Sequence, residues 1–277
     1  MIITTLARQA ALEALGYPNN PFVAWENIGA GGTLGGTAVL TDGDRANAFS
    51  GSTYDYWLPD VAGTTAYLST QITSQTIGFV GIAAHNLADL SATVAIENSA
   101  DGSTWADAGA GDHVPASNDP IAFRLPISGN SAPYWRIAVT GLTASDPLYI
   151  GVAFFGTELV FPRRFYQGFA PALGATEVQL QSSVSEGGNL VGSSVIRQGQ
   201  TLQAELGNIA PTFIRGTDFR GFMDHYNAGK PSFFGWRPEK YSGDLHYTWR
   251  AGGTLRPENT GPNELMGFKL QMRGFYG

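Results

Sequence analysis

The residues best suited to catalysis do not form a recognisable catalytic or metal-binding pattern. The chain has four histidines, His85, His113, His225 and His246, and no cysteine. No two histidines stand at the spacing of a helical zinc motif, and thiolate ligands are absent. There is no Gly-x-Ser-x-Gly nucleophile elbow, and the glycine-rich segment 30–36 lacks the Lys-Ser/Thr of a phosphate-binding loop. We therefore expect the protein not to be an enzyme.

Two aspartates stand close enough together to share a cation. Asp42 and Asp44 flank Gly43, and carboxylate oxygens with nearby backbone carbonyls are the ligands that calcium prefers. An Asp-rich turn without metal explains the same residues, and we favour it, so we expect no cofactor. A glycoside hydrolase would need two acids facing each other across a cleft, and the spacing of the acids does not indicate such a pair.

Aromatic residues in polar segments are the best candidates for ligand binding. Tyr54, Tyr56 and Trp57 lie in one polar segment, and Trp105 closes the stretch "TVAIENSADGSTW". Aromatic faces can stack on sugar rings, so these four residues are the predicted glycan contacts. The structural alternative is that Trp57 fills a core, the tyrosines cover its edge, and Trp105 folds back over a sandwich after the Asp-Gly turn.

A second aromatic segment, "FFGWRPEKY" at 233–241, mixes aromatic rings with cations. Aromatic and arginine enrichment is typical of protein–protein contacts. Internal packing explains the same composition equally well. The predicted assembly-interface residues are Phe233, Phe234, Trp236, Arg237 and Tyr241.

Composition limits the partners. Charged residues make up only 14% of the 277 residues, which is consistent with burial against other subunits. Residues 1–156 carry 4 Lys/Arg against 13 Asp/Glu, and residues 157–277 carry 12 against 10, which suggests two domains. This distribution does not indicate nucleic-acid binding, which needs a dense basic face. We expect no membrane span and no signal peptide.

The hydrophobic pattern predicts short strands and few helices. A helix is expected at 6–15, before Gly16. A second is expected near 217–228, capped by Thr217 or Asp218, with Phe219, Phe222, Met223 and Tyr226 on one face. The strands expected from the pattern are 37–40, 66–73, 76–82, 93–98, 121–125, 134–140, 149–155, 177–184, 193–198, 201–206 and 267–276.

Several of these segments resemble galactose-binding-like (discoidin-like) β-sandwich domains. The resemblance rests on "ENSADGSTW" and "APYWRIAVTG". The stretch "TDGDRANAFSGSTYDYWLP" also resembles an early segment of these domains, but its Asp-Gly-Asp and Trp stand further apart than in that family. The resemblance implies that the strands within 20–156 form a jelly-roll sandwich. Together with the pattern and the charge distribution above, we expect a mainly β chain with an N-terminal helix or arm at 1–19, that sandwich at 20–156, and a β-rich assembly domain with one amphipathic helix at 157–277. The resemblance also implies that loop aromatics can bind carbohydrate and that Asp42 and Asp44 can hold a structural calcium.

Other segments resemble tailed-phage and prophage minor tail or baseplate proteins. They are "IGFVGIAAHNLADLSATVAIE", "ELVFPRRFYQGFAP", "SEGGNLVGSSVIRQGQTLQAELGNI" and "GKPSFFGWRPEKYSGDLHYTWR". This resemblance implies a structural virion protein, made in the host cytoplasm and located in the tail. Its expected partners are other tail or baseplate proteins and copies of itself in a ring or trimer. The alternative is a carbohydrate-binding module that contacts host surface glycans.

Overall fold

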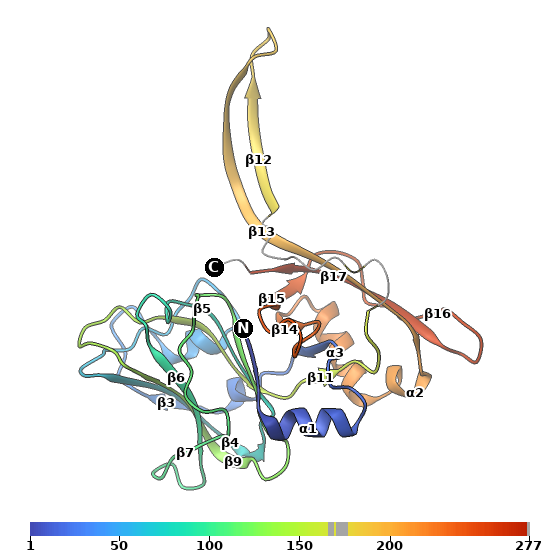
Figure 1. The fold of residues 1–277 in the computed structure, drawn as a ribbon. Helices are drawn as coiled ribbons and strands as arrows, with labels where there is room; N and C mark the ends of the chain where they lie inside the picture. The colour runs from blue at the N-terminus through green and yellow to red at the C-terminus, as the bar shows by residue number, and fades with distance from the viewer. Residues whose placement is uncertain (166–168, 170–176, 276–277) are drawn as a thin grey trace.

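A computed structural model describes the chain except for residues 166–168, 170–176 and 276–277. The expected mainly β class is confirmed, because three sheets form the body of the protein (Figure 1). The described part also contains three α-helices: α1 (Leu6–Ala14), α2 (Pro211–Ile214) and α3 (Thr217–Asn227). None of the helices in the described ranges is long and apolar enough to cross a membrane.

The first two sheets form a β-sandwich. The five-stranded sheet has the order β3 (Thr33–Gly36), β4 (Thr65–Thr76), β9 (Ser131–Thr140), β6 (Thr93–Ser99) and β7 (Ala106–Asp107). The four-stranded sheet has the order β1 (Ile2–Thr4), β8 (Ile121–Arg124), β5 (Phe79–His85) and β10 (Ile150–Gly156). Their facing side chains form one core, and the 3₁₀ turns η1 (Ile28–Gly31) and η2 (Arg45–Phe49) lie beside it.

The four-stranded sheet is covered on both faces. Every residue of β5, β8 and β10 is buried, which explains why these strands are almost continuously apolar in the sequence. One face of the sheet packs on the five-stranded sheet. The other face contributes Phe79 and Phe154 to a second core, together with Phe233 and Tyr247 from the C-terminal half. The sandwich and the C-terminal half therefore share a buried boundary.

The third sheet has eight strands. Seven follow the order β11 (Leu159–Val160), β2 (Phe22–Ala24), β14 (Ser232–Gly235), β15 (Leu245–Arg250), β17 (Met266–Gly274), β13 (Leu190–Ile209) and β12 (Glu177–Val184), and β16 (Glu258–Asn259) pairs with β17. β2 was expected within the sandwich range 20–156, but it lies between β11 and β14. Its three residues are fully buried because both neighbouring strands and the second core cover them.

The expected amphipathic helix is confirmed as α3. Phe219, Phe222 and Tyr226 are buried in the core that α3 forms with the third sheet. The expected cap differs: Gly216 occupies the N-cap position, with no side-chain hydrogen bond, so neither Thr217 nor Asp218 caps the helix. The N-terminal helix α1 is capped by the Thr5 side chain, which accepts a hydrogen bond from the backbone N–H of Arg8.

A buried ion cluster joins α1, the sandwich and the segment before β11. Arg8 and Arg124 both contact Glu158, with the closest N–O distances at 2.6 and 2.7 Å. Burial raises the pKa of the Glu158 carboxyl, but the two guanidinium groups outweigh it and hold that pKa below its ordinary value. The cluster ties three parts of the chain together.

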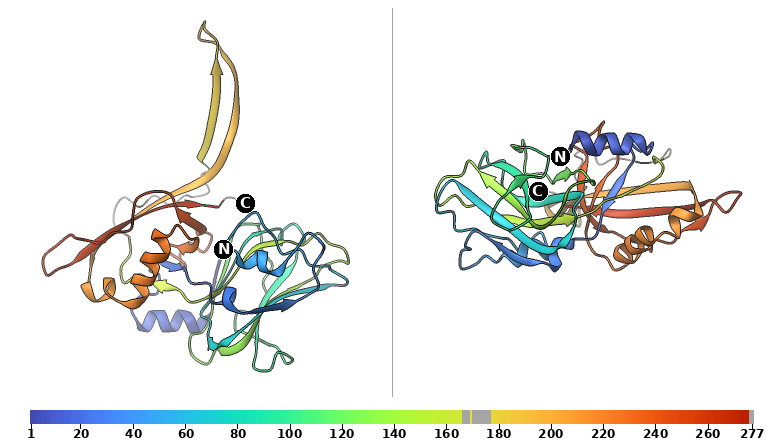
Figure 2. Two further views of the ribbon diagram at one scale, coloured as in Figure 1. Left: turned by 180° about the vertical axis from the view of Figure 1, so that it is seen from behind. Right: turned by 90° about the horizontal axis from the view of Figure 1, so that it is seen from below.

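Strands β12 and β13 form a long two-stranded arm that leaves the body. Residues 177–199 pair only within this hairpin, and β13 then continues into the body and pairs with β17 from Gln200 onward. Both side views show the arm projecting away from the sheets and helices (Figures 1 and 2). The sequence pattern predicted two separate strands at 193–198 and 201–206, which are parts of one 20-residue strand.

Candidate functional site

The four predicted glycan contacts do not form one site. Trp57 is fully buried in the sandwich core, where its backbone forms an isolated bridge with Ile150. Its ring therefore presents no surface to a ligand. Because neighbouring residues of an extended segment point to opposite sides, the inward position of Trp57 leaves Tyr56 near the surface. Tyr54 is 84% exposed.

Trp105 lies on another part of the sandwich, against the outer face of the five-stranded sheet. The guanidinium of Arg136 lies 4.2 Å from the Trp105 ring and 4.1 Å from the ring of Tyr67. Arg136 also forms an ion pair with Glu97. Trp105 is half-buried, so the structure supports a corner role in which it covers the sheet through a cation–π stack.

The turn that leads to Trp105 is stabilised by Asp101. Its carboxylate accepts hydrogen bonds from the backbone N–H groups of Ser103 and Thr104, both at 2.8 Å, and from the hydroxyl of Ser99 at 2.9 Å. The bonds from Thr104 and Ser103, with a smaller contribution from Ser99, lower the pKa of Asp101 to about 2. All of these contacts are local, so Asp101 acts as a turn residue.

Tyr56 belongs to a surface built from four loops. Its ring is tilted against that of Tyr149, with ring centroids 4.8 Å apart. The backbone N–H of Tyr149 donates to Asn86 Oδ1 at 3.0 Å. The backbone N–H of Ala88 donates to Asn118 Oδ1 at 3.0 Å. These contacts connect the loops around residues 56, 86–89, 118 and 149.

The same loops place hydrogen-bonding groups beside the tyrosine pair. Asn118 Nδ2 donates to Asp89 Oδ2 at 2.8 Å, and Asp89 is exposed. Burial raises the pKa of Tyr149, and the charges of the nearby Tyr56 and Asp89 raise it further. We call the set of Tyr54, Tyr56, Tyr149, Asp89 and Asn118 the tyrosine surface. Tyr149, Asp89 and Asn118 were missed in the sequence because nothing in their spacing links three separate loops.

Asp42 and Asp44 occupy an exposed turn. Asp44 caps η2 by accepting a hydrogen bond from the backbone N–H of Ala46 at 3.0 Å. Among the described residues, no group of three or more His, Asp or Glu side chains is arranged to hold a metal ion. The Asp44 cap fits the metal-free turn, and whether calcium binds here stays a prediction.

The buried histidines have structural partners. His85 Nε2 lies 3.1 Å from the Asp119 carbonyl oxygen, and its Nδ1 accepts from the backbone N–H of Leu87. Burial lowers the pKa of His85 to about 4, so it is neutral at pH 7. His246 Nδ1 lies 2.9 Å from Gln200 Oε1 within the third sheet. Neither histidine faces a second titratable side chain through these bonds.

The predicted assembly residues divide between core and surface. Phe233 and Phe234 are fully buried in two different cores, so they serve internal packing. Trp236 stacks on Tyr241 with ring centroids 5.3 Å apart and donates its indole N–H to Asp244 at 2.6 Å. The Arg237 guanidinium lies 5.7 Å from the Trp236 ring. Tyr241, which is 39% exposed, is the most accessible member of the stack and is available to a partner.

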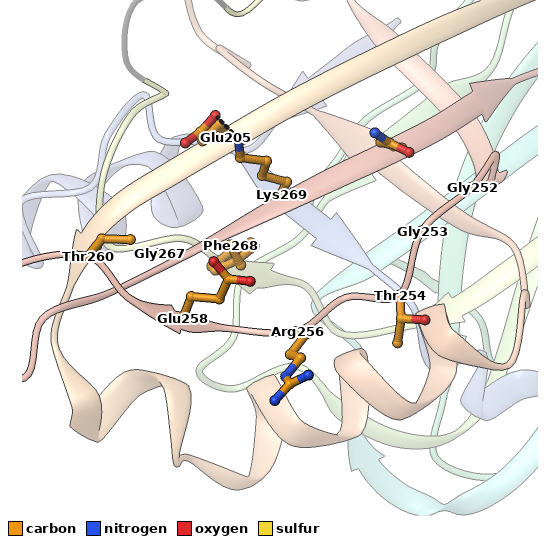
Figure 3. A pocket seen from close by; sticks show the side chains of 11 residues that line it. Glu205, Gly252, Gly253, Thr254, Arg256, Glu258, Thr260, Gly267, Phe268 and Lys269 are labelled. Atoms are coloured by element: carbon orange, nitrogen blue, oxygen red, sulfur yellow. Dashed lines mark ion pairs between the residues drawn. The ribbon is translucent and has the colours of Figure 1, made fainter.

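Several hollows of the described chain lie outside the tyrosine surface, and two of them border the third sheet. A groove of about 580 Å³ follows the exposed side of β13 and β17 (Figure 3), where Glu205 and Lys269 form an ion pair at 3.1 Å. Arg256 and Glu258 line its other side, so acids and bases alternate around it. A shallower groove of about 250 Å³ lies where the loop at 51–53 meets Pro231, Tyr247 and Trp249.

Solved structures similar to part of the chain share little sequence identity with it. No family model and no curated protein matches the chain. One similar solved structure is that of SpGH29, at 17% identity and a TM-score of 0.38, over 48% of this chain and 28% of that one. Another is chitosan-binding module 1 of a chitosanase/glucanase from Paenibacillus sp. IK-5, at 16% identity and a TM-score of 0.37, over 48% and 99%.

A third similar structure is CpGH89CBM32-5 from Clostridium perfringens in complex with GalNAc-β-1,3-galactose, at 11% identity and a TM-score of 0.39, over 48% and 100%. Nothing in the comparisons supports a tail or baseplate protein. TM-scores below 0.5 carry no functional argument, so the case must be made from the chain's own geometry.

Proposed function

We propose that the chain is a non-enzymatic carbohydrate-binding protein that contacts glycans through the tyrosine surface. The observation that carries this proposal is the tilted Tyr56–Tyr149 pair beside the hydrogen-bonded Asp89–Asn118 pair. Aromatic rings and hydrogen-bonding groups lie together at one end of the sandwich. Tyr54, which is highly exposed, lies two residues from Tyr56 on the same loop.

The chemistry of a sugar fits such a surface. A pyranose has an apolar face of C–H groups that can pack on an aromatic ring, and hydroxyls around its edge that need donors and acceptors. Asp89 accepts through two oxygens, and its bond from Asn118 fixes the orientation of the carboxylate. Because Tyr149 is held through its backbone by Asn86, the aromatic pair is preorganised, which reduces the entropy lost on binding.

A glycan array with the whole chain and the variants Tyr56→Ala and Tyr149→Ala tests this proposal. We expect a binding signal for the unmodified chain, loss of that signal in both variants, and unchanged far-UV circular dichroism. Tyr241→Ala is the matched control, because it removes an exposed tyrosine from the other half of the chain. Binding that survives both variants, or no binding to any glycan, contradicts the proposal.

We propose as a second candidate a structural role in the tail of a phage, as a tip or baseplate component. It is favoured by the projecting arm, which is a feature of subunits that assemble, and by the low charge of the chain. A sugar-binding surface is compatible with this role. Proteomics and labelled electron microscopy of particles from a host that carries the gene test it: a tail-tip label supports the role, and its absence from particles contradicts it.

A further inference from the structure

The arm formed by residues 177–199 carries a concentration of uncovered apolar side chains. Six of the thirteen large hydrophobic side chains exposed in the described chain lie on it: Val178, Leu180, Val184, Leu190, Val191 and Val195. Their exposed fractions run from 42% to 71%. Large exposed apolar patches mark interaction sites in soluble proteins.

Five of these six side chains gather on one face of the arm. Residues that stand opposite each other in an antiparallel pair share a face, and the register pairs Leu180 with Val195 and Val184 with Leu190. Strand alternation places Val178, Leu180 and Val184 on the same side of β12. The other face carries Gln181 opposite Ser194 and Ser183 opposite Gly192. The arm is therefore amphipathic, with an apolar face and a polar face.

The apolar face continues the core-facing side of the third sheet. Val178 pairs with Gln198, which lies two residues before Gln200 on β13, so Val178 shares a face with Gln200, the first residue that pairs with β17. Gln200 is 9% exposed, and Leu202, two residues further along the same face, is fully buried. The same side of one strand is thus covered in the body and uncovered in the arm, which indicates that the arm is covered by something outside this chain.

An isolated two-stranded hairpin is only marginally stable in water, so this arm needs a partner. We propose that the partner is further copies of this chain, whose arms pack their apolar faces together in a closed bundle. From 178 to 195 the arm has one charged residue, Glu186, which lies in the turn at its tip. An uncharged face meets no repulsion from its own copy, and it offers no charge pattern by which a different partner would be selected.

The apolar face alone is too small for a stable interface between two arms. β12 has eight residues, which at roughly 3.4 Å per residue gives a face about 27 Å long. Two strands about 4.8 Å apart make that face roughly 270 Å² in area. A stable interface buries about 800 Å² on each partner. The proposed closed ring gives each arm two neighbours, and it needs contacts between the bodies to supply the rest of that area.

Arm assembly is independent of sugar binding and would give the second candidate role a physical interface. Because the chain has no cysteine, single-cysteine variants report arm contacts without background. A disulfide needs Cβ atoms within about 4.5 Å, so under mild oxidation Val184→Cys should give on the order of tenfold more disulfide-linked dimer than Ser183→Cys on the opposite face. Equal cross-linking of both variants, or none in either, overturns the proposal.

Analytical ultracentrifugation provides a second test of the proposal. The whole chain should sediment as an oligomer of three or more copies, and Leu180→Asp with Leu190→Asp should sediment as a monomer. Gln181→Asp with Ser194→Asp adds the same charges to the polar face and should stay oligomeric. A monomeric whole chain, or equal dissociation by both pairs, overturns the proposal. The monomeric variant should keep its affinity for a single soluble glycan, so a failure of sugar binding and a failure of arm assembly are measured separately.

Discussion

Phe233 of β14 lies directly against the backbone of Gly81 of β5. A Cβ atom added at Gly81 would lie 2.6 Å from Cε2 of the Phe233 ring, closer than side chains approach in proteins. The contact joins the four-stranded sheet of the sandwich to the third sheet, at the centre of the core that also contains Phe79 and Phe154. The close packing of the two halves of the chain at this point therefore requires a residue without a side chain at position 81.

Gly81→Ala should destabilise the whole protein, because the new methyl group and the Phe233 ring cannot occupy the same space. Overpacking of this kind costs about 1–3 kcal/mol. Urea denaturation measures it, and a Gly81→Ala/Phe233→Leu double variant should recover part of the loss. Gly63→Ala is the control, since a Cβ there meets nothing within 4 Å. Equal effects of the two single substitutions would contradict this view of the boundary.

Glu158→Gln should cost about 3–5 kcal/mol in the free energy of unfolding, because it leaves two buried guanidinium groups without their carboxylate. Glu205→Gln breaks an exposed pair with Lys269 and should cost about 0–1 kcal/mol. Chemical denaturation of both variants gives the comparison. A similar small loss in each would show that the cluster does not hold the three parts of the chain together.

The Glu158 cluster also predicts a pH dependence. The pKa of this carboxyl is held below its ordinary value near 4.5, so its contribution is complete above that pH. As the pH falls through the folded-state pKa, the carboxyl is protonated and the contribution is lost. The stability difference between the unmodified chain and Glu158→Gln should therefore shrink in acid. A difference that is constant down to the acid-unfolding limit would argue against an ionised Glu158.

Asp101 should titrate near pH 2 in an NMR experiment that follows its side-chain carboxyl carbon. Hydrogen bonds from the backbone of Thr104 and Ser103 and the hydroxyl of Ser99 favour the charged form. Its stabilising effect on the turn is present above the ordinary pKa of 3.8 and is lost as the pH falls through about 2. Ser99→Ala should raise the midpoint, and an unchanged midpoint would mean that the hydroxyl contributes nothing.

The sequence could predict the elements whose pattern is set locally. The apolar stripe from Phe219 to Tyr226 defines α3, and the alternation around Leu180 defines β12, at the expected residues. The segment from Phe233 onward was ambiguous because a buried β14 and an exposed interface have the same composition. Only the pairing of Phe233 with Ala24 and Tyr247, far away in the chain, shows that it is core.

The candidate site could be predicted only in part for the same reason. Tyr56 stands out as an aromatic residue in a polar segment, but Trp57 stands out equally, and only the bridge to Ile150 shows that Trp57 points inward. Tyr149 looked like the first residue of a strand. Its place beside Tyr56 depends on which loops meet at one end of the sandwich, which is a property of the sheet order and not of local sequence.

The most direct test of sugar binding is an NMR titration of the whole chain, or of the monomeric arm variant, with a glycan identified on the array. The account predicts that amide shifts change together around Tyr54, Tyr56, Asp89, Asn118 and Tyr149, and that Tyr149→Ala abolishes them. Shift changes confined to the Trp105–Arg136 face or to the groove beside Glu205, or no changes at saturating sugar, would contradict it.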